Sequence, residues 1–295
     1  MLAQLAQLVI AGLTVGSGYA LVALGIHIIL RATRAINFAQ GEFVILGGLL
    51  AYSLVTVLHL SIWLALGGAT LLGFALGLLY ERVVLRPAAR VSEVAVTIAT
   101  IGTVYILLYG HALIWGSLPE PLLFFSGGPT DVAWQLFGIH IAAQQLWVLA
   151  LLAFALGVLW FFFERTAYGK AIRAAANNPV GARLVGIDVD RARAISVAIS
   201  IALAAFGGTI VGPITLVGGA GGIAIAIKGF VGAVLGGLES PVGCTIGGLL
   251  VGVIEKLLEG QFSYEIADPA VYSLLLLMLL FRPTGLFAPR SAVRD

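Results

Sequence analysis

The chain has 295 residues, of which 60% are hydrophobic and only 10% are charged, and its mean hydropathy is +1.08. An ordinary soluble domain carries about 25% charged residues, so this composition excludes that class and predicts an all-α polytopic membrane protein. The formal net charge of +2 gives no sign of a nucleic-acid partner, and the single cysteine, Cys244, excludes an internal disulfide.

Apolar runs long enough to cross a bilayer, which takes about 20 helical residues, follow one another along the chain. They occur at about residues 8–30, 42–58, 62–80, 94–115, 144–163 and 194–212. Two less regular runs, at about 221–237 and 240–260, precede a short one that begins near Pro269. We therefore expect a single transmembrane domain over residues 1–295 with about 8–10 transmembrane helices. Residues 1–7 lack the basic stretch of a signal peptide, so the first run is expected to be retained.

The basic residues predict the orientation of these spans. With the N-terminus outside and the C-terminus in the cytoplasm, every Arg and Lys except Lys228 and Lys256 falls on the cytoplasmic side. The opposite orientation would place this excess outside, against the positive-inside tendency. We therefore expect a multi-pass membrane protein in this orientation.

The longest polar stretch, residues 164–193, holds six of the 16 basic residues. Within it, residues 168–187 read as two short helices separated at 177–179, with Asn178 as the N-cap and Pro179 at the first helical position. Because the stretch lies between two apolar runs, it should form a cytoplasmic surface on which another protein docks.

Glycine is abundant, with 38 residues, and it concentrates in the C-terminal half. Pairs four residues apart, such as Gly232 and Gly236, have the spacing of close helix contacts. Adjacent pairs such as Gly207 and Gly208 admit a second interpretation, namely broken helices beside a transport path. Residues 221–260 are predicted to form a glycine-rich helical hairpin, broken or re-entrant, in which Ser240 caps the second helix. By the same capping rule, the last helix should begin at Asp268.

Polar residues near the predicted span ends are candidates for a translocation path or a gate. Asn37 and Gln40 have nearly the spacing of a capping box at the start of the second span, and Glu42 follows in its first turns. A carboxylate at the edge of a span needs a partner, and Arg31 and Arg34 are the candidates.

Four more residues complete this group of candidates. Thr97 and Thr100 lie on one face of a predicted helix with Thr103, where the hydroxyls would either line a path or, more commonly, bond to their own backbone. Glu239 and Ser240 occupy the turn of the glycine-rich hairpin, for which a solvated turn is the competing interpretation.

The sequence lacks the patterns of common enzymes. The four histidines have no Cys, His or carboxylate partner at metal-ligand spacing, and neither a nucleophile elbow nor a phosphate-binding loop is present. The chain is therefore predicted not to be an enzyme and not to hydrolyse ATP itself.

Several stretches resemble the membrane permease subunits of bacterial ABC importers for branched-chain amino acids, of the high-affinity Liv type. They are residues 12–25, 36–42, 170–187, 232–237 with 247–252, and the final 282–287. The Asn-Phe-Ala-x-Gly-Glu pattern at 37–42 is the most specific of them, although Gln40 stands where members often carry His. The resemblance covers nearly the whole chain.

This resemblance implies the ABC importer permease fold, a location in the bacterial inner membrane, and transport of branched-chain or related amino acids by ATP-driven alternating access. It implies a homologous second permease, two cytoplasmic ATP-binding subunits and an extracytoplasmic substrate-binding protein as partners. The partner ATPases would use ATP with Mg²⁺, and the chain would bind no cofactor directly. The stretch 164–193 would hold the coupling helices, with seven candidate coupling residues: Gly169, Lys170, Arg173, Ala174, Asn178, Leu184 and Gly186.

Two other classes of function stay open at this point. The first is a stand-alone ion-coupled carrier or channel for a small polar solute such as urea or short amides. The second is an intramembrane enzyme, for which the Ser, His and acidic residues are too dispersed. The exact substrate does not follow from the sequence.

Overall fold

The computed structural model describes residues 2–117, 121–126, 128, 131–136, 139–215, 218, 221–282 and 284–287. Within them, six helices are long and apolar enough to cross a membrane by length and composition. They comprise α1 (Leu2–Thr33), α3 (Ile62–Tyr80) with its extension, α5 (Glu93–Trp115), α6 (Ala143–Arg165), α9 (Val189–Thr215) and α11 (Pro241–Gln261). Shorter apolar helices are α2 (Gln40–Thr56) and α10 (Gly221–Gly236), and α12 (Tyr264–Phe281) follows α11. The predicted all-α membrane architecture is confirmed.

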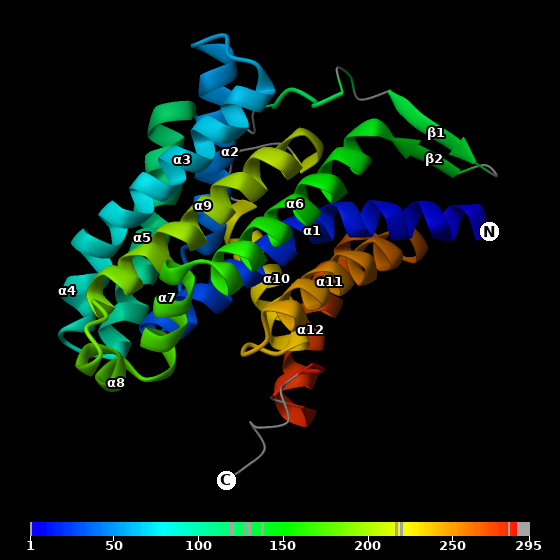
Figure 1. Cartoon of the computed structure of the whole chain (residues 1–295). Helices are drawn as coiled ribbons and strands as arrows, with labels where there is room; N and C mark the ends of the chain where they lie inside the picture. Colours follow the sequence, from blue (N-terminus) through cyan, green and yellow to red (C-terminus); the bar gives the residue numbers. More distant parts are fainter. Residues whose placement is uncertain are drawn as a thin grey trace.

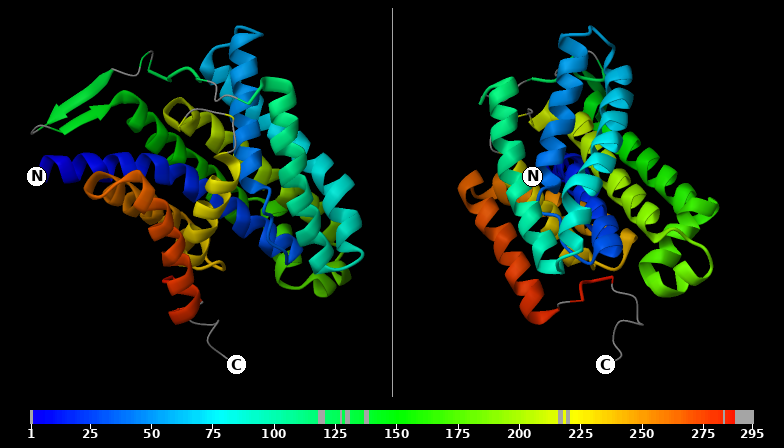
Figure 2. Two further views of the ribbon diagram at one scale, coloured as in Figure 1. Left: turned by 180° about the vertical axis from the view of Figure 1, so that it is seen from behind. Right: turned by 90° about the vertical axis from the view of Figure 1, so that its left-hand side faces the viewer.

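The long helices α1 and α9 form the centre of the molecule, and α5 and α6 lie at its periphery (Figures 1 and 2). In their most apolar windows, 78% of α1 and 83% of α9 are buried, against 28% of α5 and 17% of α6. Apolar side chains of α5 such as Ile106 and Leu113 are exposed. The outer helices therefore present the surface that lipid or another subunit would cover.

Glycine lets the central helices touch backbone to backbone, as the four-residue spacing predicted. A Cβ atom at Gly232 would lie 2.7 Å from the Cα of Gly248, and one at Gly16 would lie 2.9 Å from the carbonyl oxygen of Leu249. At Gly208 it would lie 1.9 Å from the Val44 carbonyl oxygen. Gly207 and Gly208 sit inside the continuous helix α9, so this pair marks close packing rather than a broken helix.

The remaining elements cap the two ends of the bundle. At one end lie the π-helical turn η1 (Glu81–Leu85), α4 (Arg86–Ala89), α7 (Ala167–Asn177) and α8 (Pro179–Leu184). At the other lie the start of α1 and an antiparallel hairpin of β1 (Val132–Leu136) and β2 (Ile139–Ala142) (Figure 1). The sequence did not predict this hairpin. Gln7 holds it to α1, since its side-chain amide donates to the His140 carbonyl oxygen at 2.6 Å and accepts from the His140 N–H at 3.0 Å.

The helix α3 ends at Tyr80, where the apolar run was predicted to end, and η1 and α4 extend the helical path to Ala89. One predicted helix boundary is wrong. The last helix begins at Tyr264, and Pro269 lies inside it. Asp268 does not cap this helix because its carboxylate pairs with Lys228 at 2.7 Å. By contrast, Ser240 caps α11 as predicted, accepting from the Gly243 N–H at 3.0 Å.

Candidate functional site

The helices α7 and α8 form where local capping signals dictate. The Thr166 hydroxyl accepts from the Gly169 N–H at 3.0 Å and starts α7. The Asn178 side chain accepts from the Gly181 N–H at 2.9 Å and starts α8, with Pro179 at its first position. The two predicted short helices, separated at Asn178, are confirmed.

A small core of its own holds this helix pair together. It contains Ile172, Ala175, Ala182 and Ala192, against which Ile187 packs. At the end of α8, Gly186 has φ +83 and the Ile187 N–H donates to the Ala182 carbonyl oxygen at 2.9 Å. Glycine tolerates this left-handed conformation, which ends the helix and returns Ile187 to the core. The α7–α8 pair is thus a folded unit at the end of the bundle.

The outer side of the α7–α8 pair carries both charge and exposed apolar surface. Val180, Leu184 and Val185 are 69%, 84% and 75% exposed. Of the predicted coupling residues, six are exposed: Lys170, Arg173, Ala174, Asn178, Leu184 and Gly186. Large exposed apolar side chains beside charges are typical of a surface that a partner covers.

Gly169 differs from the other predicted coupling residues because it is buried. A Cβ atom there would lie 2.2 Å from the Phe162 carbonyl oxygen. Gly169 therefore allows α7 to fold back against the end of α6 and offers no side chain to a partner. Val180 and Val185 were not predicted to belong to this surface, although their apolar character beside the basic Arg183 was the available signal.

Polar contacts tie the α7–α8 pair to the membrane helices. The Arg173 guanidinium pairs with Glu164 at the end of α6, and the Arg31 guanidinium at the end of α1 donates to the Asn177 side chain at 2.5 Å. Side-chain contacts therefore connect α7 to both α1 and α6.

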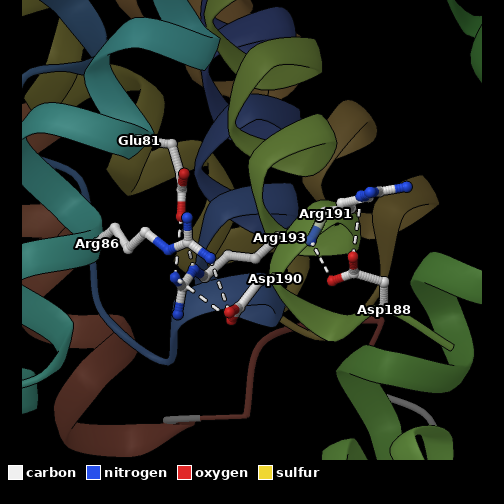
Figure 3. Close-up of polar contacts among 6 residues, drawn as sticks. All are labelled: Glu81, Arg86, Asp188, Asp190, Arg191 and Arg193. Atoms are coloured by element: carbon white, nitrogen blue, oxygen red, sulfur yellow. Dashed lines mark hydrogen bonds and ion pairs between the residues drawn. The ribbon is translucent and has the colours of Figure 1, made fainter.

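A second set of contacts joins η1 and α4 to the start of α9 (Figure 3). The Arg193 Nε donates to Glu81 Oε1 at 3.0 Å, and Arg86 pairs with Asp190 at 2.7 Å. The Glu81 side chain is only 3% exposed and that of Arg193 18% exposed. Glu81 begins the π-helical turn, a distortion often found at functional sites. This ionic network, Glu81, Arg86, Asp190 and Arg193, holds the start of α9 against η1 and α4.

The predicted gating residues Asn37 and Gln40 lie buried where four helices meet. The Asn37 amide donates to Gln40 Oε1 at 3.2 Å, and the Tyr80 hydroxyl donates to Asn37 Oδ1 at 3.4 Å. The Gln40 amide donates to the Ser200 carbonyl oxygen at 3.0 Å, and the Ser200 hydroxyl donates to that of Gly25 at 2.8 Å. The structure replaces the predicted capping box with this side-chain network, because Ala39 precedes the helix and makes no side-chain cap.

Glu42 does not pair with Arg31 or Arg34, contrary to the prediction. Its Oε2 lies 3.6 Å from Nδ1 of His111 on α5, and both side chains are almost fully buried. The carboxylate abuts the first turn of α10, since a Cβ atom at Gly222 would lie 2.3 Å from its Oε1. The prediction failed because the arginines remain at the end of the bundle while Glu42 points inward.

Of the remaining predicted path residues, the structure brings only Thr100 to the Asn37–Gln40 segment. Thr97 and Thr103 donate to the Glu93 and Ala99 carbonyl oxygens of their own helix, and Thr100 donates to that of Thr97 at 2.7 Å. Glu239 is exposed and borders a cavity of about 510 Å³ beside α7, which Arg31 and Arg173 also line. Thr100 also accepts from the Phe38 N–H at 3.4 Å, so it lies beside the Asn37–Gln40 junction, whereas Glu239 lies elsewhere.

A larger cavity, of about 700 Å³, opens near the opposite end of the bundle between α1, α9, α10 and α11. Among its lining residues are Tyr19, Lys228, Glu255 and Glu259. The Lys228 ammonium pairs with Glu255 at 2.9 Å and with Asp268 at 2.7 Å. The sequence distinguishes Lys228 as a basic residue away from the others, but it does not predict these acidic partners.

Comparisons with known proteins agree over almost the entire chain. The model of the family described as "Branched-chain amino acid transport system / permease component" matches residues 8–282. The high-affinity branched-chain amino acid transport system permease protein LivH of Salmonella typhimurium is 32% identical over 93% of this chain and 92% of its own length. The corresponding protein BraD of Pseudomonas aeruginosa is 31% identical, over 95% and 94%. A solved structure, PsaBC from Streptococcus pneumoniae in complex with Fab, matches in fold, with a TM-score of 0.50, 13% identity, and coverage of 96% and 92%.

Proposed function

Because the chain belongs to the family of permease components of branched-chain amino acid transport systems, we propose that it is the permease subunit of a binding-protein-dependent ABC importer. Its substrates are branched-chain or related amino acids, and it moves them by alternating access between two global conformations. The transporter comprises a homologous second permease, two ATP-binding subunits and a substrate-binding protein. The ATP-binding subunits bind ATP with Mg²⁺ and supply the energy.

The observation that carries the coupling part of this proposal is the α7–α8 pair. Its exposed Val180, Leu184 and Val185 lie beside basic side chains on a unit with its own core. An amphipathic helix of this kind fits a groove on a partner protein, and the partner here is the ATPase. Because it has its own core, the α7–α8 pair transmits force as a rigid unit and not as a flexible loop.

The force follows the polar contacts already described. When the ATPases close, α7 pulls α1 through the Arg31–Asn177 hydrogen bond. The ionic network pulls α3 through the Glu81–Arg193 ion pair. The buried junction of Asn37 and Gln40 joins these same helices. We assign gating to this junction together with Glu42.

The orientation follows from the positive-inside tendency. The end of the bundle that carries α4, α7 and α8 faces the cytoplasm, and the end with the β1–β2 hairpin faces outside. The test labels single cysteines with a membrane-impermeant maleimide in intact cells, on a Cys244→Ala background. We expect labelling of Leu58→Cys, between α2 and α3, and no labelling of Arg183→Cys until the cells are opened. The reverse pattern would reject the orientation.

The proposed activity is tested by reconstituting the permease with its partner subunits and binding protein. We expect uptake of L-leucine that requires ATP. Leu184→Asp places a charge at the docking surface and should reduce uptake at least tenfold, whereas Leu184→Met keeps the surface apolar and should transport normally. Uptake by the permease without ATPase subunits would instead support the stand-alone carrier.

A further inference from the structure

The cavity of about 510 Å³ lies between α1, α6, α7 and the start of α11. Figure 1 shows α1 between α6 and α11, the two helices that border the cavity on its outer side. There, Trp160 of α6 and Val242 of α11 are 58% and 66% exposed. The cavity is therefore a groove that opens between α6 and α11 toward the surroundings of the bundle.

The groove has an apolar wall and a charged mouth. The wall consists of large apolar side chains: Leu24, Ile28, Leu159, Phe163, Val242 and Ile246. The Arg165 guanidinium lies over the ring of Trp160, 5.5 Å from its centroid. Tryptophan beside a basic residue at a helix end is typical of the membrane–water interface. The mouth therefore lies at the depth of the lipid headgroups, and the wall faces the hydrocarbon.

Two of the four charges that line the groove lack an oppositely charged partner. Arg173 and Glu164 pair with each other. The Arg31 guanidinium donates to the neutral Asn177 side chain, and neither Arg31 nor Glu239 forms an ion pair with any residue that the structure describes. One cation and one anion therefore stay available for a ligand.

These two free charges lie close to each other. Arg31 follows His27 by one turn of α1. The His27 Nδ1 lies 2.7 Å from the carbonyl oxygen of Leu238, and Glu239 is the next residue. The mouth therefore presents a guanidinium and a carboxylate side by side above an apolar wall.

This arrangement selects for the chemistry of the occupant. An arginine binds a phosphate through parallel N–H donors, and a carboxylate accepts from a primary ammonium group. A phospholipid with an ethanolamine headgroup carries a phosphate, a nearby ammonium and an apolar chain. A choline headgroup has no N–H to donate, and a glycerol headgroup has no cation.

We infer that this groove binds one ethanolamine phospholipid, with its phosphate on Arg31, its ammonium on Glu239 and an acyl chain along the apolar wall. Ile172 and Ala176 of α7 also line the groove, so the lipid contacts the inner side of the proposed coupling unit. The inference goes beyond the proposed function and takes from it only the orientation, which assigns the lipid to the cytoplasmic leaflet.

Quenching of Trp160 fluorescence by brominated lipids tests the inference. The complete transporter is placed in nanodiscs that contain an increasing fraction of lipid brominated on the upper part of one acyl chain. The signal of Trp160 is the difference between the wild type and Trp160→Phe, which removes the contribution of all other tryptophans. We expect half-quenching at an about fivefold lower fraction of ethanolamine lipid than of choline or glycerol lipid, the size expected of one partly solvated charge pair.

Two variants, each with a matched control, separate the roles of the two charges. Glu239→Gln should abolish the preference for ethanolamine, whereas Glu93→Gln, at another exposed acid that does not line the groove, should retain it. Arg31→Gln should weaken the quenching by all three lipids, because each carries a phosphate. Asn177→Ala breaks the hydrogen bond to Arg31 but keeps the cation, so it should bind lipid like the wild type.

Several results would overturn the inference. Equal quenching by the three lipids would show only unselective contact with the surrounding bilayer. A preference for ethanolamine that survives Glu239→Gln, or unchanged quenching in Arg31→Gln, would reject the assigned contacts. These measurements involve no transport, so the proposed function is judged separately by ATP-dependent uptake of L-leucine.

Discussion

The two ends of the bundle use charge in opposite ways. At the α7–α8 end, Arg173 and Glu164 are about half exposed, and water shares in solvating them. In the cavity at the other end, Lys228 and Glu255 are buried and depend on each other. Exposed ion pairs contribute little to stability, whereas breaking a buried pair leaves an uncompensated charge. The exposed pair of Arg173 and Glu164 is therefore available for contact with a partner, whereas the buried pair of Lys228 and Glu255 depends on its own charge balance.

The largest expected effect is that of Lys228→Met. It removes the cation shared by Glu255 and Asp268 and leaves two carboxylates close together. We expect a loss of about 3–5 kcal/mol in the free energy of unfolding, the cost of breaking a buried pair. Denaturant unfolding in bicelles measures it. Adding Glu255→Gln to Lys228→Met should recover part of the loss, and a double variant no more stable than the single one would contradict this account.

Arg193→Ala should have the next largest effect. Arg193 pairs with the buried Glu81, but its own side chain is 18% exposed, so water compensates in part. We expect a loss of about 2 kcal/mol, within the range for charged hydrogen bonds. The same unfolding experiment applies, with Arg191→Ala as the control, because Arg191 is 85% exposed. Equal losses of unfolding free energy in Arg193→Ala and Arg191→Ala would contradict the claim that the buried ion pair contributes more than the exposed one.

Gly186→Val should lower the free energy of unfolding by less than Arg193→Ala does. A β-branched residue is strained at the φ of +83 that Gly186 adopts, which we expect to cost about 1–2 kcal/mol, locally in the α7–α8 pair. Hydrogen exchange should rise at Ile187 and remain unchanged in α1. ATP hydrolysis should continue while L-leucine uptake falls, because the coupling unit no longer ends correctly. Uptake that keeps pace with hydrolysis would count against this role of Gly186.

Arg173→Ala should have the smallest effect on stability, below about 1 kcal/mol, because its pair with Glu164 is solvated. Its effect on transport should nevertheless be large, with L-leucine uptake uncoupled from ATP hydrolysis. Glu164→Gln breaks the same ion pair but leaves Arg173 available to the partner. If both variants transport equally, the ion pair matters rather than contact with the ATPase.

The sequence was most informative where structure is decided locally. The caps at Asn178 and Ser240 depend on neighbouring residues, and the sequence located both. Apolar runs likewise located the long helices. The sequence alone did not predict pairings between distant segments, because these pairings depend on which helix faces meet. Glu42 meets His111 and Lys228 meets Asp268 only after α2, α5, α10 and α12 have packed.

Asp268 illustrates how tertiary contacts override a local rule. An Asp-Pro pair is a good helix start by propensity, yet the carboxylate pairs with Lys228 and the helix begins earlier, at Tyr264. Glycine spacing succeeded in predicting close helix contacts, but adjacent glycines did not mark a break in α9. Adjacent glycines therefore indicate close helix packing as readily as a break in a helix.

The glycine contacts among α1, α10 and α11 limit how this protein can change shape. Gly248 lies with its Cα against Gly232 on one side, and a methyl group there would meet the Ala20 backbone at 2.4 Å on the other. With main chain resting on main chain, no rotamer change can absorb a shift, and sliding would force the atoms into collision. We expect α1, α10 and α11 to move as one rigid body, with the hinges of the conformational change at the segments that connect this body to the other helices.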